Sequence, residues 1–182
     1  MEVVTVYCGS CVGNDHRYQQ AAQRLGSCLA KEKISLVYGG ARVGLMGALA
    51  DSVLGAGGDV VGVIPKSLNQ PDIVHQGLTR LEVVDSIQER KSRMMALGDG
   101  LIALPGGFGT LEELFEALAW SQLNWHHKPC AVLNVCGYYD SLLTFLDRAA
   151  HQEFLSAGNR NLLLHAETPE ELLALMVKTT HD

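Results

Sequence analysis

The chain reads Leu101-Ile102-Ala103-Leu104-Pro105-Gly106-Gly107-Phe108-Gly109-Thr110-Leu111-Glu112-Glu113 at its most apolar segment. The four apolar residues before Pro105 predict a strand that is buried on both faces. The residues after it predict a helix, because apolar side chains recur at helical spacing at Leu111, Leu114, Phe115 and Leu118. A strand, a glycine turn and a helix therefore follow one another here.

The glycines of this stretch suit a ligand that carries negative charge. Glycine lets the backbone approach a ligand closely and adopt positive φ, and the free N–H groups at the start of a helix attract an anion such as phosphate. Three glycines within four positions after a buried strand therefore predict a phosphate or nucleotide site. The alternative is a tight turn that binds nothing.

Length, composition and charge limit what kind of protein this is. The 182 residues are enough for one sizeable core and short for two, so we expect a single nucleotide-binding domain over residues 1–182. No apolar run reaches membrane-spanning length and no secretory leader is visible, which predicts a cytoplasmic protein with no membrane partner. A net charge of -6 without a basic stripe argues against a nucleic-acid polymer as partner. Five scattered cysteines favour a reducing compartment over a disulfide framework.

Apolar strands alternate with helices along the whole chain. Because the strands are apolar throughout, they predict a parallel sheet with helices on both faces, a doubly wound, Rossmann-like α/β fold. Ligands of such folds bind beyond the carboxyl ends of the strands. Residues 66–77 show no periodicity and are expected to form a lid or a binding loop. Strands are expected at 3–7, 34–38, 60–64, 81–84, 101–104, 131–135 and 162–164, and the other helices near 15–29, 45–54, 86–97, 139–150 and after 168.

A second glycine loop, Gly39-Gly40-Ala41-Arg42-Val43-Gly44, follows the expected strand at 34–38. This loop, the loop after Leu104 and Cys8-Gly9-Ser10-Cys11 all lie at carboxyl ends of strands, so we expect them to converge on one pocket. Neither glycine loop has the G-x-G-x-x-G spacing of a dinucleotide site or the Gly-Lys-Ser/Thr of a triphosphate loop. A mononucleotide or a sugar phosphate fits better. The C-x-x-C spacing in the first loop leaves a thiol switch as an alternative use.

Glu113 has a structural alternative to a chemical role. Thr110-x-x-Glu113 is also a capping box, in which the glutamate reaches back to the Thr110 N–H. Ser86-x-x-Glu89 and Thr168-x-x-Glu171 have the same form. Only the box at Glu113 adjoins a glycine-rich anion loop.

The densest cationic cluster comprises Arg90, Lys91 and Arg93, in the first turns of the helix expected from residue 86. Cations at a helix N-terminus oppose the helix dipole, a mild cost that a bound phosphate would offset. The alternative is a solvated helix face, which is the usual place of such residues.

Four motifs together resemble the LOG family, the cytokinin riboside 5′-monophosphate phosphoribohydrolases long mislabelled as possible lysine decarboxylases. The resemblance covers nearly the whole chain. It implies hydrolysis of the N-glycosidic bond of adenosine 5′-monophosphate (AMP), or of an N6-modified (cytokinin) nucleotide, to free base and ribose 5-phosphate. It also implies a homodimer and no metal or organic cofactor. The motifs are Tyr38-Gly39-Gly40, Gly44-Leu45-Met46-Gly47, Arg90-Lys91 and Pro105-Gly106-Gly107-x-Gly109-Thr110-x-x-Glu113.

The catalytic arginine and glutamate of the family fall on Arg90 and Glu113. A carboxylate there would stabilise an oxocarbenium-like transition state directly or by activating water. Arg90 would orient the nucleotide or balance charge on the departing base. The resemblance places the substrate-binding positions at Ser10, Gly40, Gly44, Met46, Asp72, Lys91, Gly106, Gly107, Gly109, Thr110 and Glu112.

Three positions depart from the family pattern. Ala41 stands where many members have a third glycine, Ile87-Gln88 replace a common Met-His pair, and Asp72 replaces a substrate-contacting glutamate. The shorter Asp72 side chain leaves the preference for N6-modified nucleotides open.

Two further functions are alternatives. One is a nucleotide-binding or carrier protein of the same fold that does not turn its ligand over. The other is a pyridoxal-dependent decarboxylase, for which the glycine loops offer no Schiff-base lysine.

Overall fold

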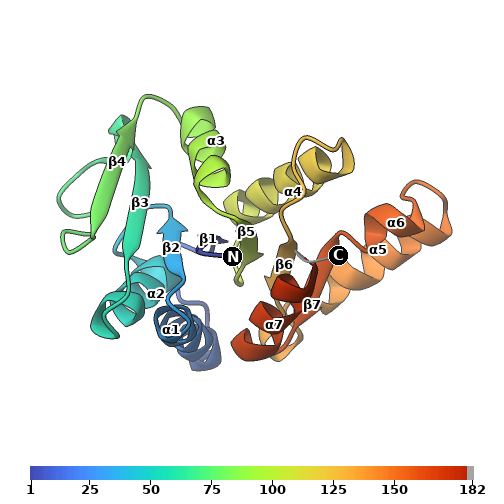
Figure 1. The fold of residues 1–182 in the computed structure, drawn as a ribbon, viewed down its shortest axis with the longest axis horizontal. Helices are drawn as coiled ribbons and strands as arrows, with labels where there is room; N and C mark the ends of the chain where they lie inside the picture. The colour runs from blue at the N-terminus through green and yellow to red at the C-terminus, as the bar shows by residue number, and fades with distance from the viewer. Residues whose placement is uncertain (180–182) are drawn as a thin grey trace.

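The computed structural model describes residues 1–179, in which seven strands form one parallel sheet. The order across the sheet is β4-β3-β2-β1-β5-β6-β7 (Figure 1). The predicted parallel sheet of a doubly wound α/β fold is thereby confirmed. The strands are β1 (Val3–Tyr7), β2 (Ser35–Tyr38), β3 (Val60–Pro65), β4 (Arg80–Val84), β5 (Gly100–Ala103), β6 (Cys130–Leu133) and β7 (Leu163–Ala166).

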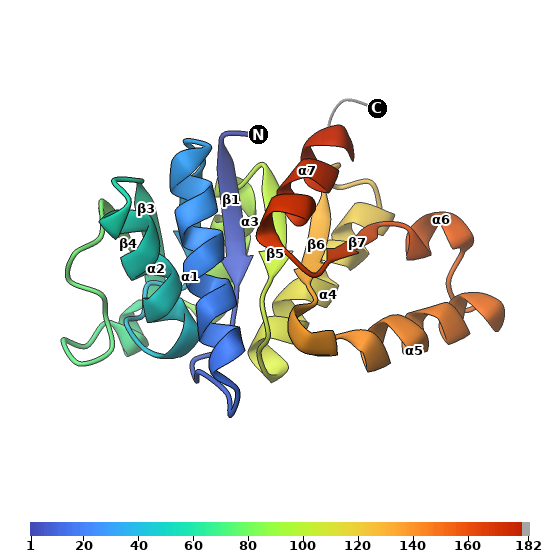
Figure 2. The same ribbon diagram turned by 90° about the horizontal axis from the view of Figure 1, so that it is seen from below.

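Helices cover both faces of the sheet (Figures 1 and 2). One face carries α1 (His16–Lys31), α2 (Gly44–Gly55) and α7 (Pro169–Thr179). The other carries α3 (Ile87–Leu97), α4 (Phe108–Gln122) and α5 (Asp140–His151). Short turns of helix occur at η1 (Lys66–Leu68), η2 (Val135–Gly137) and α6 (Ala157–Arg160), of which the sequence pattern indicated none.

Strand β5 shows why its sequence is apolar throughout. Leu101 and Ala103 pack into the cores on the α3–α4–α5 face, whereas Ile102 and Leu104 pack into the core on the α1–α2–α7 face. All four side chains are fully buried, because side chains alternate along a strand and both faces of this sheet are covered.

The direction in which the chain crosses the sheet reverses between β1 and β5. From β1 the chain moves outward through β2 and β3 to β4, then returns through α3 to β5, on the other side of β1. The loops that leave β1 and β5 therefore diverge to opposite faces, and space for a ligand opens between them at the carboxyl ends. The loop after Leu104 begins at this point.

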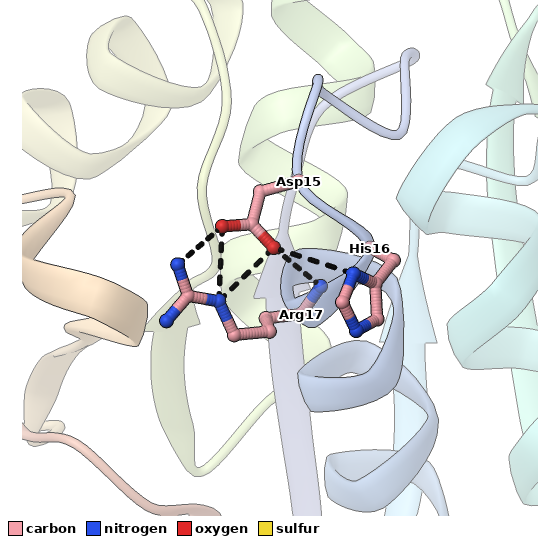
Figure 3. Close-up of polar contacts among 3 residues, drawn as sticks. All are labelled: Asp15, His16 and Arg17. Atoms are coloured by element: carbon pink, nitrogen blue, oxygen red, sulfur yellow. Dashed lines mark hydrogen bonds and ion pairs between the residues drawn. The ribbon is translucent and has the colours of Figure 1, made fainter.

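Helix α1 begins where the sequence predicted, near Asp15. The Asp15 carboxylate accepts a hydrogen bond from the backbone N–H of Arg17 at 2.9 Å and pairs with the Arg17 guanidinium, with His16 alongside (Figure 3). This cap ends the loop that follows β1 and holds it against the start of the helix. Within residues 1–179, no helix is long and apolar enough to cross a bilayer.

Candidate active site

The three loops after β1, β2 and β5 lie against one another, as predicted. The Gly9 N–H donates to the Pro105 carbonyl at 3.0 Å, and the Leu45 N–H donates to the Gly9 carbonyl at 3.2 Å. A methyl group on Gly44 would collide with the backbone of Ser10. Beside this junction is a cavity of about 310 Å³, lined chiefly by residues 9–13 and 105–107 and by Tyr18, Leu45 and Tyr138.

The capping-box interpretation of Glu113 is wrong. Helix α4 begins at Phe108 and its N-cap is Gly107, with no side-chain cap, so Thr110 already lies inside the first turn. The other two boxes have their predicted hydroxyl caps. Ser86 Oγ accepts from the Glu89 N–H at 3.1 Å and Thr168 Oγ1 accepts from the Glu171 N–H at 3.4 Å.

Glu113 is instead a buried carboxyl that faces Arg90. Its side chain is 10% exposed, and its Oε1 lies 3.4 Å from Arg90 Nη2. Burial raises the pKa of Glu113 to about 7, Arg90 opposes this shift, and the neighbouring Glu112 adds to it. A carboxyl that titrates near neutral pH is suited to proton transfer.

Arg90 reaches this position from α3 and rests on the second glycine loop. Its guanidinium lies so close to Gly39 that a methyl group there would collide with Nη2, and Met46 Sδ lies beside the same spot. The first glycine of Tyr38-Gly39-Gly40 therefore makes room for Arg90, a role that the sequence did not reveal. Arg90 Nε is buried and has no hydrogen-bond partner among residues 1–179, so one donor of the guanidinium is unused by the protein.

Lys91 ties α3 to α4 next to this pair. Its ammonium is buried and forms ion pairs with Glu112 and, at 3.1 Å, with Glu116. The hydrogen bond to Glu112 raises the pKa of Lys91, with the bond to Glu116 acting in the same direction. The predicted positions Lys91 and Glu112 are thus brought together, and Glu116 joins them without having been predicted.

The glycines of the loop after β5 differ in their surroundings. Gly106 packs against the buried Thr110 side chain, which a methyl group at Gly106 would displace. Gly107 and Gly109 are exposed, and methyl groups at either would meet nothing within 4 Å. Open space thus adjoins the first turn of α4, where backbone N–H groups have no intrahelical partner.

The other predicted positions surround the β2 loop. Gly40 has a φ of +78° and is buried, whereas Ser10 is exposed at the cavity. Residues 66–77 pack on this loop through hydrogen bonds from Arg42 N–H to Ile73 O (2.9 Å) and His75 N–H to Gly40 O (3.0 Å). The Asp72 side chain is exposed, and its backbone carbonyl contacts the β2 loop by accepting a hydrogen bond from Arg42 Nε at 3.0 Å. Contact of its side chain with substrate stays a prediction.

The cysteines of the first loop do not favour a thiol switch. Cys8 is buried and Cys11 is exposed, and both are free thiols. Burial raises the pKa of the Cys8 thiol, with Glu113 adding to the effect, so the reactive thiolate is disfavoured at neutral pH.

Comparison with known proteins identifies the family. Residues 46–176 match the family model described as possible lysine decarboxylase. A cytokinin riboside 5′-monophosphate phosphoribohydrolase of Rhodococcoides fascians is 48% identical over 94% of this chain and 87% of its own length. The enzyme of that name from Arabidopsis thaliana is 44% identical over 93% of this chain and 80% of its own.

Solved structures share the fold at much lower sequence identity. A molybdenum cofactor binding protein from Rippkaea orientalis superimposes with a TM-score of 0.74 at 23% identity, over 99% of this chain and 97% of that one. The molybdenum cofactor carrier protein of Chlamydomonas reinhardtii has a TM-score of 0.73 at 20% identity, over 99% and 98%. At such identities the likeness concerns the fold alone, whereas the sequence matches show that the chain belongs to the LOG family of cytokinin riboside 5′-monophosphate phosphoribohydrolases.

Proposed function

We propose that this chain hydrolyses the N-glycosidic bond of AMP or of an N6-modified AMP, releasing the free base and ribose 5-phosphate. Residues 1–182 act in this proposal as one nucleotide-binding domain. The observation that carries it is the position of Glu113 on α4, the helix that begins at the end of the glycine loop. The Glu113 carboxyl is buried there and lies against Arg90 of α3. The names of the relatives, which specify cytokinin nucleotides, support the N6-modified substrates.

In this proposal the glycine loop binds the substrate, and the Arg90–Glu113 pair acts on the bond that breaks. The N–H groups at the start of α4 bind the 5′-phosphate, which fixes the ribose at a set distance from Glu113 on the same helix. The bond between C1′ and the base nitrogen breaks, and its electron pair leaves with the base. Glu113 as carboxylate stabilises the positive charge on the sugar and takes a proton from the water whose oxygen adds to C1′, while the departing base nitrogen takes up a proton from solvent. Arg90, with an unused Nε donor, orients the nucleotide or offsets charge on the departing base.

The decarboxylase alternative has little support from the site. A pyridoxal Schiff base needs a lysine whose amine is neutral when it reacts. Lys91 adjoins the pair, but its ammonium is bound by Glu112 and Glu116, and the first of these raises its pKa. Both contacts favour the charged form, which is not a nucleophile.

Glu113→Gln tests the proposed reaction, because glutamine keeps the shape of the side chain and removes its charge. We expect release of free base from AMP and from an N6-substituted AMP to fall by about 10²- to 10⁴-fold, the usual contribution of a general base. Chromatography of the products measures the free base directly. Base release at the wild-type rate would show that Glu113 is not catalytic.

The same assay separates hydrolysis from a carrier function. A carrier would bind AMP, as equilibrium dialysis measures, and the wild type would release no base. A matched control is Asp147→Asn. It removes the charge of another paired carboxylate, that of Asp147 on α5, which lies 2.7 Å from the Arg160 guanidinium. Base release should stay unchanged.

The assembly and location of the protein form the last part of the proposal. We infer a homodimer, supported by large apolar side chains exposed in and just after α4, among them Phe108 (94% exposed) and Trp125 (67%). Sedimentation would then report twice the 19.7 kDa mass of the chain. The five free cysteines support a reducing compartment such as the cytoplasm.

A further inference from the structure

Four successive carbonyl groups of the loop after β5, at residues 104–107, all accept hydrogen bonds from protein donors. Two of the donors are tyrosine hydroxyls from a distant segment, and two are backbone N–H groups. In order along the loop, the donors are Tyr139 Oη (2.7 Å), Gly9 N (3.0 Å), Tyr138 Oη (2.7 Å) and Leu111 N (3.1 Å).

The N–H groups of residues 106–110, unlike the carbonyl groups of the same loop, have no hydrogen-bond partner in the described part of the chain. A phosphate is attracted by N–H groups and repelled by carbonyl oxygens, which carry partial negative charge. Since its acceptors are used and its donors are free, this loop has the polarity that an anion requires.

The segment that supplies the two tyrosines is built around an unusual turn. Cys136 and Gly137, between β6 and α5, have φ values of +54° and +70°. The buried Asn134 braces the turn, accepting from the Tyr139 N–H and donating to Asp140 Oδ1, each at 2.7 Å. A non-glycine residue in the left-handed region persists only where its surroundings hold it there, and such positions gather at functional sites.

The two rings approach the loop from different environments. Tyr139 is 1% exposed and reaches the Leu104 carbonyl from within the core. Tyr138 is 42% exposed, lines the 310 Å³ cavity, and is steadied by edge contacts with Tyr18 and Tyr139, at centroid distances of 5.7 and 5.0 Å. Its hydroxyl therefore holds the Gly106 carbonyl from the side that adjoins the cavity.

We propose that Tyr138 and Tyr139 are positioning residues of the phosphate loop, whose hydroxyls engage the Leu104 and Gly106 carbonyls so that the loop offers a bound phosphate only N–H donors. The proposal rests on the proposed function in one respect, that this loop holds the 5′-phosphate of the substrate. The tyrosines act through the loop and take no part in bond cleavage.

Tyr138→Phe and Tyr139→Phe remove only the hydroxyls and provide the test. Binding of ribose 5-phosphate, measured by calorimetry, should weaken about five- to tenfold in Tyr138→Phe, the effect of one lost hydrogen bond. Binding of adenosine, which has no phosphate, should not change. With AMP as substrate, KM should rise by the same factor while kcat stays within about twofold.

Thr144→Val is the matched control, because it removes a hydroxyl that donates to the Asp140 carbonyl on α5 at 2.9 Å, away from the loop. It should bind ribose 5-phosphate as the wild type does. Should Tyr139→Phe fail to fold, the half-exposed Tyr138 still provides the test. A Tyr138→Phe variant that melts at the wild-type temperature and keeps wild-type affinity for ribose 5-phosphate would overturn the proposal, as would equal losses for adenosine.

This outcome is separable from failure of the proposed function. A wild-type protein that binds ribose 5-phosphate but releases no base from any nucleotide would contradict hydrolysis. Weaker binding of ribose 5-phosphate by Tyr138→Phe would still support the role of the tyrosines. A wild-type protein that binds neither ribose 5-phosphate nor inorganic phosphate would overturn both.

Discussion

The glycine loops after β2 and β5 look alike in sequence and do opposite things in the structure. In the β2 loop, Gly44 packs on the Ser10 backbone and Gly40 packs on Ile64. Residues 73–75 form backbone hydrogen bonds with the same loop. In the β5 loop, Gly107 and Gly109 face open space, and the N–H groups of residues 106–110 have no partner within residues 1–179. The first loop uses glycine to pack backbone on backbone, whereas the second uses it to leave room for a ligand.

The difference shows what a glycine-rich loop requires before it is treated as an anion site. Both loops precede a helix, and a helix N-terminus ordinarily leaves N–H groups free to bind an anion. At α2, however, the chain itself fills the space, since the Leu45 N–H already donates to Gly9. The number of glycines does not separate the two cases, but the pairing of N–H and carbonyl groups does.

The largest expected effect is on stability, from Gly44→Ala in the β2 loop. Gly44 has a φ of +60°, and its new methyl group would collide with Ser10, so we expect a loss of about 3 kcal/mol or more in the free energy of unfolding. Chemical denaturation measures it. Gly57→Ala is the control, because Gly57 has a φ of +78° but open space around it, and should cost only about 1 kcal/mol. Equal losses in the two variants would show that the β2 loop is not tightly packed.

Gly107→Ala in the β5 loop should do the reverse. The residue has a negative φ and no neighbour within 4 Å of the new methyl group, so stability should change by no more than about 1 kcal/mol. The methyl group would enter the space of the phosphate, and KM for AMP should rise about tenfold. Steady-state kinetics and thermal melting measure the two quantities. An unchanged KM would argue that the anion binds elsewhere.

The helices after the two loops also differ in the burial of their carboxyl groups, and the pH dependence of kcat/KM tests this difference. Helix α2 carries the exposed Asp51, bonded to His75, whereas α4 carries the buried Glu113, whose pKa burial raises to about 7, against the effect of Arg90. Because the proposed role needs the carboxylate, kcat/KM should rise with pH and be about fivefold higher at pH 7 than at pH 6. A profile that falls over this range would mean that Glu113 acts as the acid.

Glu116→Gln controls for titration of the substrate phosphate, which has a pKa near 6. Glu116 contributes to the raised pKa of Glu113, so its neutralisation should move the inflection to lower pH. The pKa of the phosphate would not move. An inflection that is the same in both proteins would assign the profile to the substrate.

Most of the fold could be predicted because apolar runs mark the strands and glycines mark the turns, and both signals are local in the sequence. All seven strands lie within one or two residues of their predicted positions. Five of them, β1, β2, β3, β5 and β6, are buried almost throughout, which explains why their sequences are apolar runs. The helix start at Phe108 was missed because a backbone cap at Gly107 has no side-chain signature. Phe115, placed on the apolar stripe of α4, is 38% exposed, since helical spacing alone does not show which face is covered.

The site was less predictable, because its parts meet only in three dimensions. Arg90 and Glu113 were assigned through family resemblance, and their contact depends on how α3 and α4 cross the sheet. Gly39 and the Tyr138-Tyr139 pair were overlooked as site residues. Nothing local marks a glycine that accommodates a distant arginine, or a tyrosine whose hydroxyl reaches a loop more than 30 residues away.

The position of β1 at the centre of the sheet has a consequence for synthesis on the ribosome. Its partner β2 follows within about 30 residues, but the strand on its other side, β5, begins only at residue 100. At about 5–20 residues per second, the open edge of β1 waits several seconds for its second neighbour. During that interval an apolar strand with unpaired backbone groups is available to other chains, so the nascent chain is most exposed to misassembly before β5 has emerged.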